Sequence, residues 1–417
     1  MRTTFSVPKW ILHVAVIFVF IAYVCLMNVR IEIDRISNIV ILLPVFGYIA
    51  WAFSRTYINW NIFGSMAIAI LSIAMFYQLL TKPLNTPYPF VSYVILLSCD
   101  YFPVAVYHTL MKRQKRKEMQ IVFVVITILL VYVYINTIME YGVNANAVHA
   151  LTKMNYLNAT DDISNIATID TSYAIIPLIC LVSYYIKNIQ YRFFKTLLII
   201  IAAMLIYVAM IAQYTSVILI LLIVLAFETI KTSNKNYSKI IWFMLIGVLV
   251  CFLPMILELM AKTVDSANMR VRMIEVANAL RYGDLSGYNL SSRLNLYMEG
   301  IEAFLKSPIW GNERLNFNPH SSFIQIAADL GVFGFIPYIF LLNQANKSIK
   351  STLHGKSRVI FKAAVLSLII TGIINPIISM YAMYMIIFLY IPLGLQIFYG
   401  GKTANEYSCD GKAPMEN

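Results

Sequence analysis

His320 is the residue best placed for acid–base chemistry in this 417-residue chain. It lies in the segment Asn318-Pro319-His320-Ser321-Ser322, where a polar loop meets a long apolar stretch. Asn318 is a type of residue that caps helices, and Pro319 suits a first helical turn. Backbone N–H groups near His320 would then attract an anion. A neutral imidazole there can accept a proton from a hydroxyl group, and nearby positive charge would keep it neutral by lowering its pKa.

Five arginines lie in the polar segment 258–320 that leads to this histidine. With two lysines they balance seven acidic residues, so the segment is not a basic patch. A guanidinium can bind two phosphate oxygens at once, which suits a diphosphate ligand. The simpler interpretation pairs these arginines with acidic neighbours such as Glu275 and Asp284, or with lipid headgroups. The five are Arg270, Arg272, Arg281, Arg293 and Arg314.

The residues that follow Arg293 have the pattern of an amphipathic helix. Its apolar face comprises Leu294, Tyr297, Met298, Ile301, Phe304 and Leu305, and its polar face Asn295, Glu299, Glu302 and Lys306. We expect this helix to lie on a membrane surface, with Arg293 at the height of the lipid headgroups. We expect the apolar face to serve packing rather than lipid recognition.

The composition predicts an all-α, polytopic integral membrane protein. The chain is 60% hydrophobic and 12% charged, with a mean hydropathy of +0.73. Twelve apolar runs are long enough to cross a bilayer, and we interpret them as one transmembrane domain over residues 1–399. They lie near 10–27, 36–53, 60–80, 89–110, 119–139, 171–187, 194–212, 214–230, 240–257, 322–342, 359–378 and 380–399. An alternative joins 194–212 and 214–230 into one broken helix, which leaves eleven crossings.

Lysine and arginine set the predicted orientation. With the basic run 111–117 on the cytoplasmic side, 20 of the 32 basic residues lie in cytoplasmic loops and tails. Four lie in the short and medium outward loops. The large loop 258–320 and the smaller loop 140–170 then face outward. The polar segment 400–417 is predicted to be a disordered cytoplasmic tail.

Several functional classes are disfavoured. The net charge of +12 reflects cytoplasmic loops, so a nucleic-acid partner is not supported. Four of the five cysteines lie in apolar spans and one in the tail, with no zinc spacing among them. No Asp-x-Asp pair is placed for a metal–diphosphate site, and we expect neither a metal nor a cofactor.

Two carboxylates lie in or near predicted spans, where a charge is unfavourable. Asp329 is near enough to the outer surface to pair with an arginine. Asp100 is interpreted as a structural hydrogen-bonding residue beside Tyr101 or Tyr107.

The 45 residues Ser291–Phe335 carry a series of short motifs. In order they read Ser-x-Arg, an amphipathic helix, Ser-Pro-x-x-Gly, a loop, and Pro-His-Ser-Ser-x-x-Gln-x-x-x-x-Leu-Gly-x-x-Gly. This order resembles the O-antigen polymerase and O-antigen ligase superfamily of bacterial membrane glycosyltransferases. That family usually has Asn where this chain has Ser321 and Leu where it has Ile324. An arginine that usually follows the residue matching Ser216 is replaced by Val217.

The resemblance implies a polymerase of O-antigen or capsular polysaccharide in the bacterial inner membrane, with its site facing the periplasm. Donor and acceptor would be oligosaccharides linked to undecaprenyl pyrophosphate, with membrane lipids and a chain-length regulator protein as further partners. His320 would deprotonate the acceptor and Arg293 would stabilise the leaving group. The predicted substrate-binding residues are Arg270, Arg272, Arg281, Arg314, Ser321 and Asp329.

Two alternatives stay open. An O-antigen ligase would transfer the glycan to a lipid A core sugar instead. A transporter or lipid flippase would place ionisable residues at mid-membrane and use repeated, interrupted helices.

Overall fold

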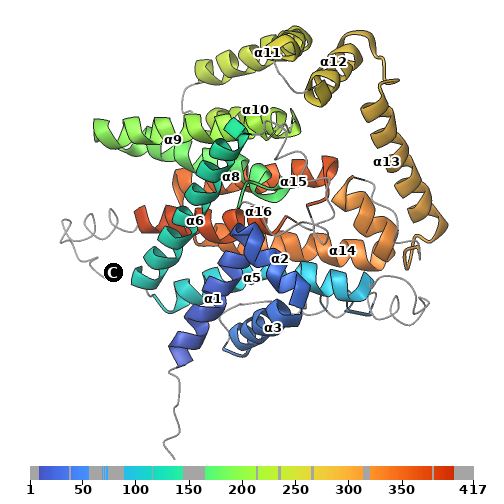
Figure 1. Cartoon of the computed structure of the whole chain (residues 1–417). Coiled ribbons are helices and arrows are strands. Elements are labelled where there is room, and N and C mark those ends of the chain that lie inside the picture. Colours follow the sequence, from blue (N-terminus) through green and yellow to red (C-terminus); the bar gives the residue numbers. More distant parts are fainter. Residues whose placement is uncertain are drawn as a thin grey trace, which may run out of the picture.

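The computed structural model is helical throughout its regular elements (Figure 1). It describes residues 9–36, 39–55, 68, 70, 72–73, 89–114, 116–143, 165–212, 215–232, 236–263, 267–312, 320–377 and 380–398, and none of these is in a strand. The elements are α1 (Lys9–Cys25), α2 (Met27–Ile36), α3 (Ile39–Ser54), α5 (Pro89–Lys112), α6 (Arg116–Val143), α8 (Ile169–Asn188), α9 (Arg192–Ile211), α10 (Thr215–Thr232), α11 (Asn236–Thr263), α12 (Ala267–Tyr282), α13 (Tyr288–Lys306), α14 (Ser322–Ser351), α15 (Gly355–Ile374), α16 (Tyr381–Met385) and the π-helical turn η2 (Ile386–Tyr390).

Helices cover eleven of the twelve predicted apolar ranges. The range 60–80 lies mostly outside the described residues, as do the tail 400–417 and most of the loop 140–170. Six helices within the described residues are long and apolar enough to cross a membrane, which supports a helical membrane protein. They are Arg116–Glu140, Ile169–Asn188, Arg192–Ile211, Ser322–Ser351, Gly355–Ile374 and Tyr381–Phe398.

α9 and α10 are separate helices that run in opposite directions. The hydroxyl of Ser216, at the start of α10, pairs with Tyr173 near the start of α8. Glu228, near the end of α10, accepts a hydrogen bond of 2.8 Å from Lys187 near the end of α8. α10 therefore runs parallel to α8, whereas α9 starts where α8 ends. The alternative of one broken helix over 194–230 is wrong.

Hydrogen bonds between distant segments define two ends of the helix bundle. At one end, which we call the basic end, Lys187 pairs with Glu228 and His108 contacts Ser348 at 3.0 Å. At the other, the His320 end, the N–H of Asn28 donates to Asn165 Oδ1 at 3.0 Å. His108 comes shortly before the run 111–117, which we predicted to be cytoplasmic, and Asn165 lies in the loop 140–170, which we predicted to face outward.

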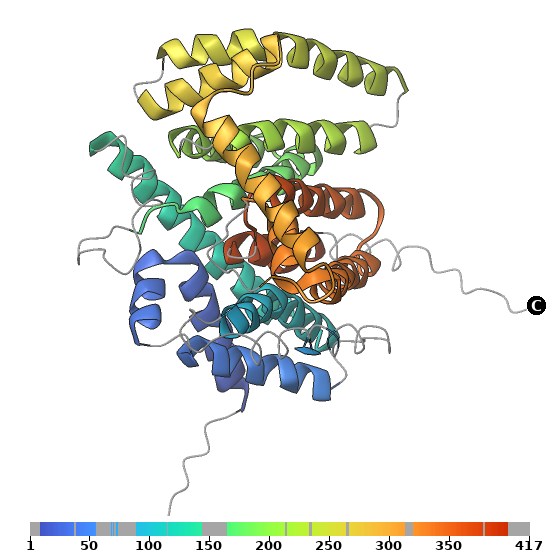
Figure 2. The ribbon, with the colours of Figure 1, turned by 90° about the vertical axis from the view of Figure 1, so that its right-hand side faces the viewer.

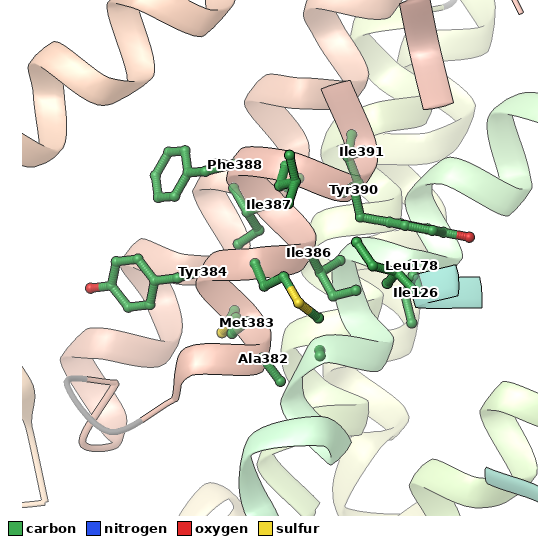
Figure 3. Close-up of a cluster of buried hydrophobic side chains, with 14 of the residues drawn as sticks. Ile126, Leu178, Ala382, Met383, Tyr384, Ile386, Ile387, Phe388, Tyr390 and Ile391 are labelled. Atoms are coloured by element: carbon green, nitrogen blue, oxygen red, sulfur yellow. The ribbon is translucent and has the colours of Figure 1, made fainter. Parts of the chain in front are cut away.

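The last helix forms much of the core, and every residue from Met380 to Leu395 is buried. Figure 3 shows Tyr384 and Phe388 on one side of this helix and Tyr390 on the other, toward Leu178 and Ile126. The Tyr384 hydroxyl pairs with the Tyr338 hydroxyl of α14 at 2.7 Å. This central helix lies against α5, α8, α14 and α15, so it links the elements that carry the polar residues described next.

α13 runs across the ends of α14 and α15 rather than alongside them (Figures 1 and 2). Its Tyr297 hydroxyl donates to the carbonyl of Ile374 at the end of α15, at 3.3 Å. The helix is longer than the sequence predicted, because it begins at Tyr288 and so includes Arg293 within it. α12, an element that the apolar pattern did not reveal, packs on α11 and leads into α13.

Candidate functional site

His320 lies directly before α14, in a backbone conformation that few residues adopt. Its φ is 51°, in the left-handed region, which costs free energy in a residue with a Cβ. Ser321 is the N-cap of α14, and its hydroxyl accepts from the Ile324 N–H at 3.5 Å. The predicted cap at Asn318 is therefore wrong by three residues.

The start of α14 is bonded within the protein, contrary to the expected anion site. The Ser322 N–H donates to the carbonyl of Asn375 at 3.4 Å, and the N–H of Ile377 donates to the Ser322 hydroxyl. The Ser321 hydroxyl donates to the carbonyl of Gly372 at 3.2 Å, and this residue is buried. Ser321 therefore caps α14 and holds it against α15, and its role in substrate binding stays a prediction.

Arg293 of α13 lies close enough to His320, in the turn before α14, to act on it electrostatically. Burial lowers the pKa of His320 below its ordinary 6.5, and the positive charge of Arg293 lowers it further. Both effects favour the neutral imidazole at neutral pH. Each side chain is partly exposed, so a ligand can reach both.

Three further polar residues complete what we call the Arg293 cluster. The Tyr173 hydroxyl of α8 pairs with Ser216 Oγ of α10 and accepts from Asn375 Nδ2 at 2.8 Å. Arg293 interacts electrostatically with the same hydroxyl. The cluster therefore joins α8, α10, α13 and the end of α15 beside His320. Its members are Tyr173, Ser216, Arg293, His320 and Asn375.

Sequence analysis missed Tyr173 and Asn375. Both lie at the ends of apolar helices and in no recognised motif. The only available signal was Asn375-Pro376 in an otherwise apolar stretch, a pair typical of a chain turn. Ser216 had been singled out because no arginine follows it. Its partner in the structure is the Tyr173 hydroxyl, with which Arg293 interacts electrostatically.

The motif glycines join the turn after α13 to a break in α14. Gly331 has φ 61° and ψ −164°, which interrupts the helix. A Cβ at Gly331 would collide with the backbone of Ile309, and one at Gly311 with the backbone of Asp329. The Asn312 N–H donates to the carbonyl of Ala328 at 2.7 Å. The Ser-Pro-x-x-Gly turn at 307–311 thus packs into the break in α14, and the two motifs hold each other in place.

The other predicted binding residues lie on α12, at the break in α14, or outside the described residues. Arg281 is exposed and forms an ion pair of 2.7 Å with Glu258 of α11. Arg270 and Arg272 lie on the same helix, α12, and Arg314 lies outside the described residues. Asp329 is buried at the break in α14, next to Gly311.

Buried charges inside the bundle were only partly anticipated. Asp170 accepts from the N–H groups of Ala382 at 3.0 Å and Met383 at 3.4 Å, at the start of α16, with Arg30 at 3.9 Å. This is the favourable position for an anion at a helix N-terminus. Asp100 is buried and neither of its oxygens has a hydrogen-bond partner, so the expected bond to Tyr101 or Tyr107 is not formed.

The part of the chain that the structure describes contains no group of three or more His, Cys, Asp or Glu residues arranged to hold a metal ion. No model of a known protein family matches the chain, and neither does any curated protein. The resemblance to the O-antigen polymerase and ligase superfamily therefore depends on the motif residues alone.

Proposed function

We propose that this protein is a membrane glycosyltransferase that polymerises lipid-pyrophosphate-linked oligosaccharides into a bacterial surface polysaccharide. The observation that carries the proposal is the joint placement of His320 and Arg293, in which an imidazole of lowered pKa lies within the electrostatic influence of a guanidinium. A base beside a cation suits the transfer of a sugar from a pyrophosphate leaving group.

In the proposed reaction the acceptor hydroxyl attacks the anomeric carbon of the donor sugar. His320 takes the hydroxyl proton as the new C–O bond forms, and the bond to pyrophosphate breaks on the opposite face, with inversion. The pyrophosphate leaves with the electron pair, and Arg293 stabilises its negative charge. The Tyr173 hydroxyl of α8 is held by Ser216 of α10 and by Asn375 at the end of α15. In the proposal it holds Arg293 in position.

The proposed site faces away from the cytoplasm, in the inner membrane of a bacterium. The bundle supports this orientation, because basic residues such as Lys112, Lys187, Lys350 and Arg358 lie at the end opposite His320, within helices or turns joined there. Anionic substrates on a lipid carrier would then approach along the periplasmic face of the inner membrane. On the proposed orientation, α13, which crosses the ends of α14 and α15 (Figure 2), lies at that face.

A purified-protein assay with synthetic lipid-linked repeat units tests the proposal. We expect His320→Ala to lower the rate of glycan lengthening by roughly 10²- to 10⁴-fold, the usual contribution of a general base. His354→Ala is the matched control, because His354 is an exposed histidine at the basic end. Unchanged lengthening by the His320→Ala protein would remove the catalytic assignment.

A ligase differs from a polymerase only in its acceptor. Deletion of the gene in its host separates the two, when the surface glycan is run on a gel. Products with a single repeat unit indicate a polymerase, whereas long glycan that is not attached to lipid A core indicates a ligase.

Two observations favour the transporter alternative enough to keep it. Asp100 is a buried carboxylate without a hydrogen bond, and α14 is interrupted at Gly331, features found in membrane transporters. The test uses protein reconstituted in vesicles. The transporter class would be favoured if the unaltered protein moves lipid-linked repeat units without any glycosyl transfer, and if Asp100→Asn abolishes that movement. Glycosyl transfer that persists in Asp100→Asn supports the proposed enzyme.

A further inference from the structure

An apolar cavity of about 580 Å³ lies between α6, α8, α9 and the last helix. Its walls are almost entirely hydrocarbon and aromatic surface, and they have no part in the Arg293 cluster. Lining residues include Phe123, Leu130, Leu181, Leu197, Met204 and Tyr390. The lining also includes Tyr191 and Phe398, which lie next to the ends of their helices on the basic side, so the cavity reaches the basic end of the bundle.

The cavity adjoins protein surface that is apolar and exposed. Leu197 and Phe194 of α9 line it and remain 44% and 53% exposed. Ile200, also on α9, is 59% exposed, and Ile128 of α6 is 60% exposed. Both helices qualify as membrane-crossing segments, so this surface lies against lipid hydrocarbon. A hydrocarbon chain that enters the cavity gains dispersion contacts that an empty space would forfeit.

Positive charge lies where the cavity meets the basic end. Arg192 and Lys195 lie in the first turn of α9, both are exposed, and they flank the cavity residue Phe194. No acidic residue occurs between Lys187 and Glu228 in the sequence. This charge complements a phosphate headgroup of net negative charge, whereas a zwitterionic headgroup would bring a positive group to the same place.

We propose that the cavity binds one acyl chain of an anionic phospholipid from the leaflet at the basic end, with Arg192 and Lys195 at its phosphate. The lipid carrier of the proposed reaction is the wrong occupant, because its pyrophosphate belongs at the His320 end. The tail after Phe398 is also unsuited, since its sequence from Gly400 to Asn417 is polar. This inference does not depend on the proposed catalytic activity.

Native mass spectrometry of the full-length protein in detergent tests the site, with dioleoylphosphatidylglycerol and dioleoylphosphatidylcholine as probes. We expect the unaltered chain to hold one phosphatidylglycerol. Leu197→Trp, which fills the cavity, should reduce the bound fraction about tenfold, equivalent to roughly 1.4 kcal/mol. Ile200→Trp is the matched control, because Ile200 is exposed on the same helix and does not line the cavity. Met204→Phe gives a second, milder way of filling it.

Charge is tested separately. The double variant Arg192→Gln, Lys195→Gln should weaken phosphatidylglycerol binding by about fivefold for each charge removed, and leave phosphatidylcholine binding unchanged. Lys231→Gln with Lys356→Gln, two exposed lysines elsewhere at the basic end, should change neither. The proposal fails if monodisperse Leu197→Trp and Met204→Phe proteins keep the lipid. It also fails if the unaltered chain holds both lipids equally, or if filling the cavity dissociates a dimer of this chain instead.

Discussion

At the scale of single residues, the charge of Arg293 should control the proton affinity of His320. Arg293 lowers the pKa of His320, so Arg293→Gln should raise that pKa. The base form is present above the pKa, and activity should therefore rise with pH through it. We expect the acidic limb of kcat/KM against pH to move to higher pH in Arg293→Gln, in addition to a lower plateau.

Arg281→Gln is the control for this shift. Arg281 is paired with Glu258, and it is not among the charges that act on His320. Its replacement should leave the position of the acidic limb unchanged even if the plateau falls. An acidic limb that stays in place in Arg293→Gln would show that another group limits the rate.

Tyr173 is expected to position the site. Tyr173→Phe removes the hydroxyl that joins Ser216, Asn375 and Arg293, so we expect kcat to fall roughly tenfold, the value of one net hydrogen bond. Tyr184→Phe removes a comparable buried hydroxyl, bonded to Ser357 at 3.3 Å, from the other half of α8. Equal losses of kcat in the two variants, with matching losses of thermal stability, would mean that Tyr173 acts only on the fold.

The residues that sequence could identify were those with a local pattern. His320 and Arg293 belong to motifs within one 45-residue stretch, so their spacing pointed to them. Tyr173 and Asn375 are 202 positions apart, and only the packing of α8 against α15 brings them together. The cap of α14 was misplaced because Asn and Ser are both good caps, and the bond from Ser321 to Gly372 decides between them.

At the scale of elements, the contact between the turn 307–312 and the break in α14 should be the least tolerant part of the site. Gly331→Ala puts a Cβ into the backbone of Ile309 and keeps a left-handed φ, so we expect the unfolding free energy to fall by more than about 2 kcal/mol. The apparent melting temperature in detergent should fall clearly, and glycan lengthening with it.

Gly247→Ala is the matched control within α11. A Cβ there meets nothing within 4 Å, and alanine is favoured over glycine in a helix interior by about 1 kcal/mol. Its melting temperature should stay the same or rise. A Gly331→Ala protein as stable as the Gly247→Ala protein would contradict the tight insertion of the turn.

The amphipathic pattern of α13 predicted the helix but not the use of its apolar face. Leu294, Met298, Ile301 and Leu305 are exposed, whereas Tyr297 and Phe304 are partly covered. The expectation that the face serves packing is therefore wrong for most of it. Hydrophobic periodicity identifies an apolar stripe on a helix, but it does not tell whether protein or lipid covers that stripe. An exposed stripe on a helix that crosses the ends of α14 and α15 suits a membrane surface.

At the scale of the whole molecule, hydropathy predicted where helices occur and not which helices meet. Apolar runs of membrane length identified eleven ranges that are helical in the structure. α12 escaped notice because it is polar. The neighbours of the last helix depend on side-chain packing between segments that are far apart in sequence. The hydrophobic pattern within one helix does not identify those neighbours.

Cysteine labelling tests the predicted orientation of the bundle. Leu285, between α12 and α13, and Ser351, at the end of α14, are both exposed, one in the predicted outward loop and one at the basic end. In a chain whose exposed Cys251 and tail Cys409 are replaced by serine, Leu285→Cys should react with a membrane-impermeant maleimide on intact spheroplasts. Ser351→Cys should react only after permeabilisation, because basic loops are retained in the cytoplasm. The reverse pattern would turn His320 and Arg293 toward the cytoplasm, where an extracytoplasmic polymerase site cannot lie.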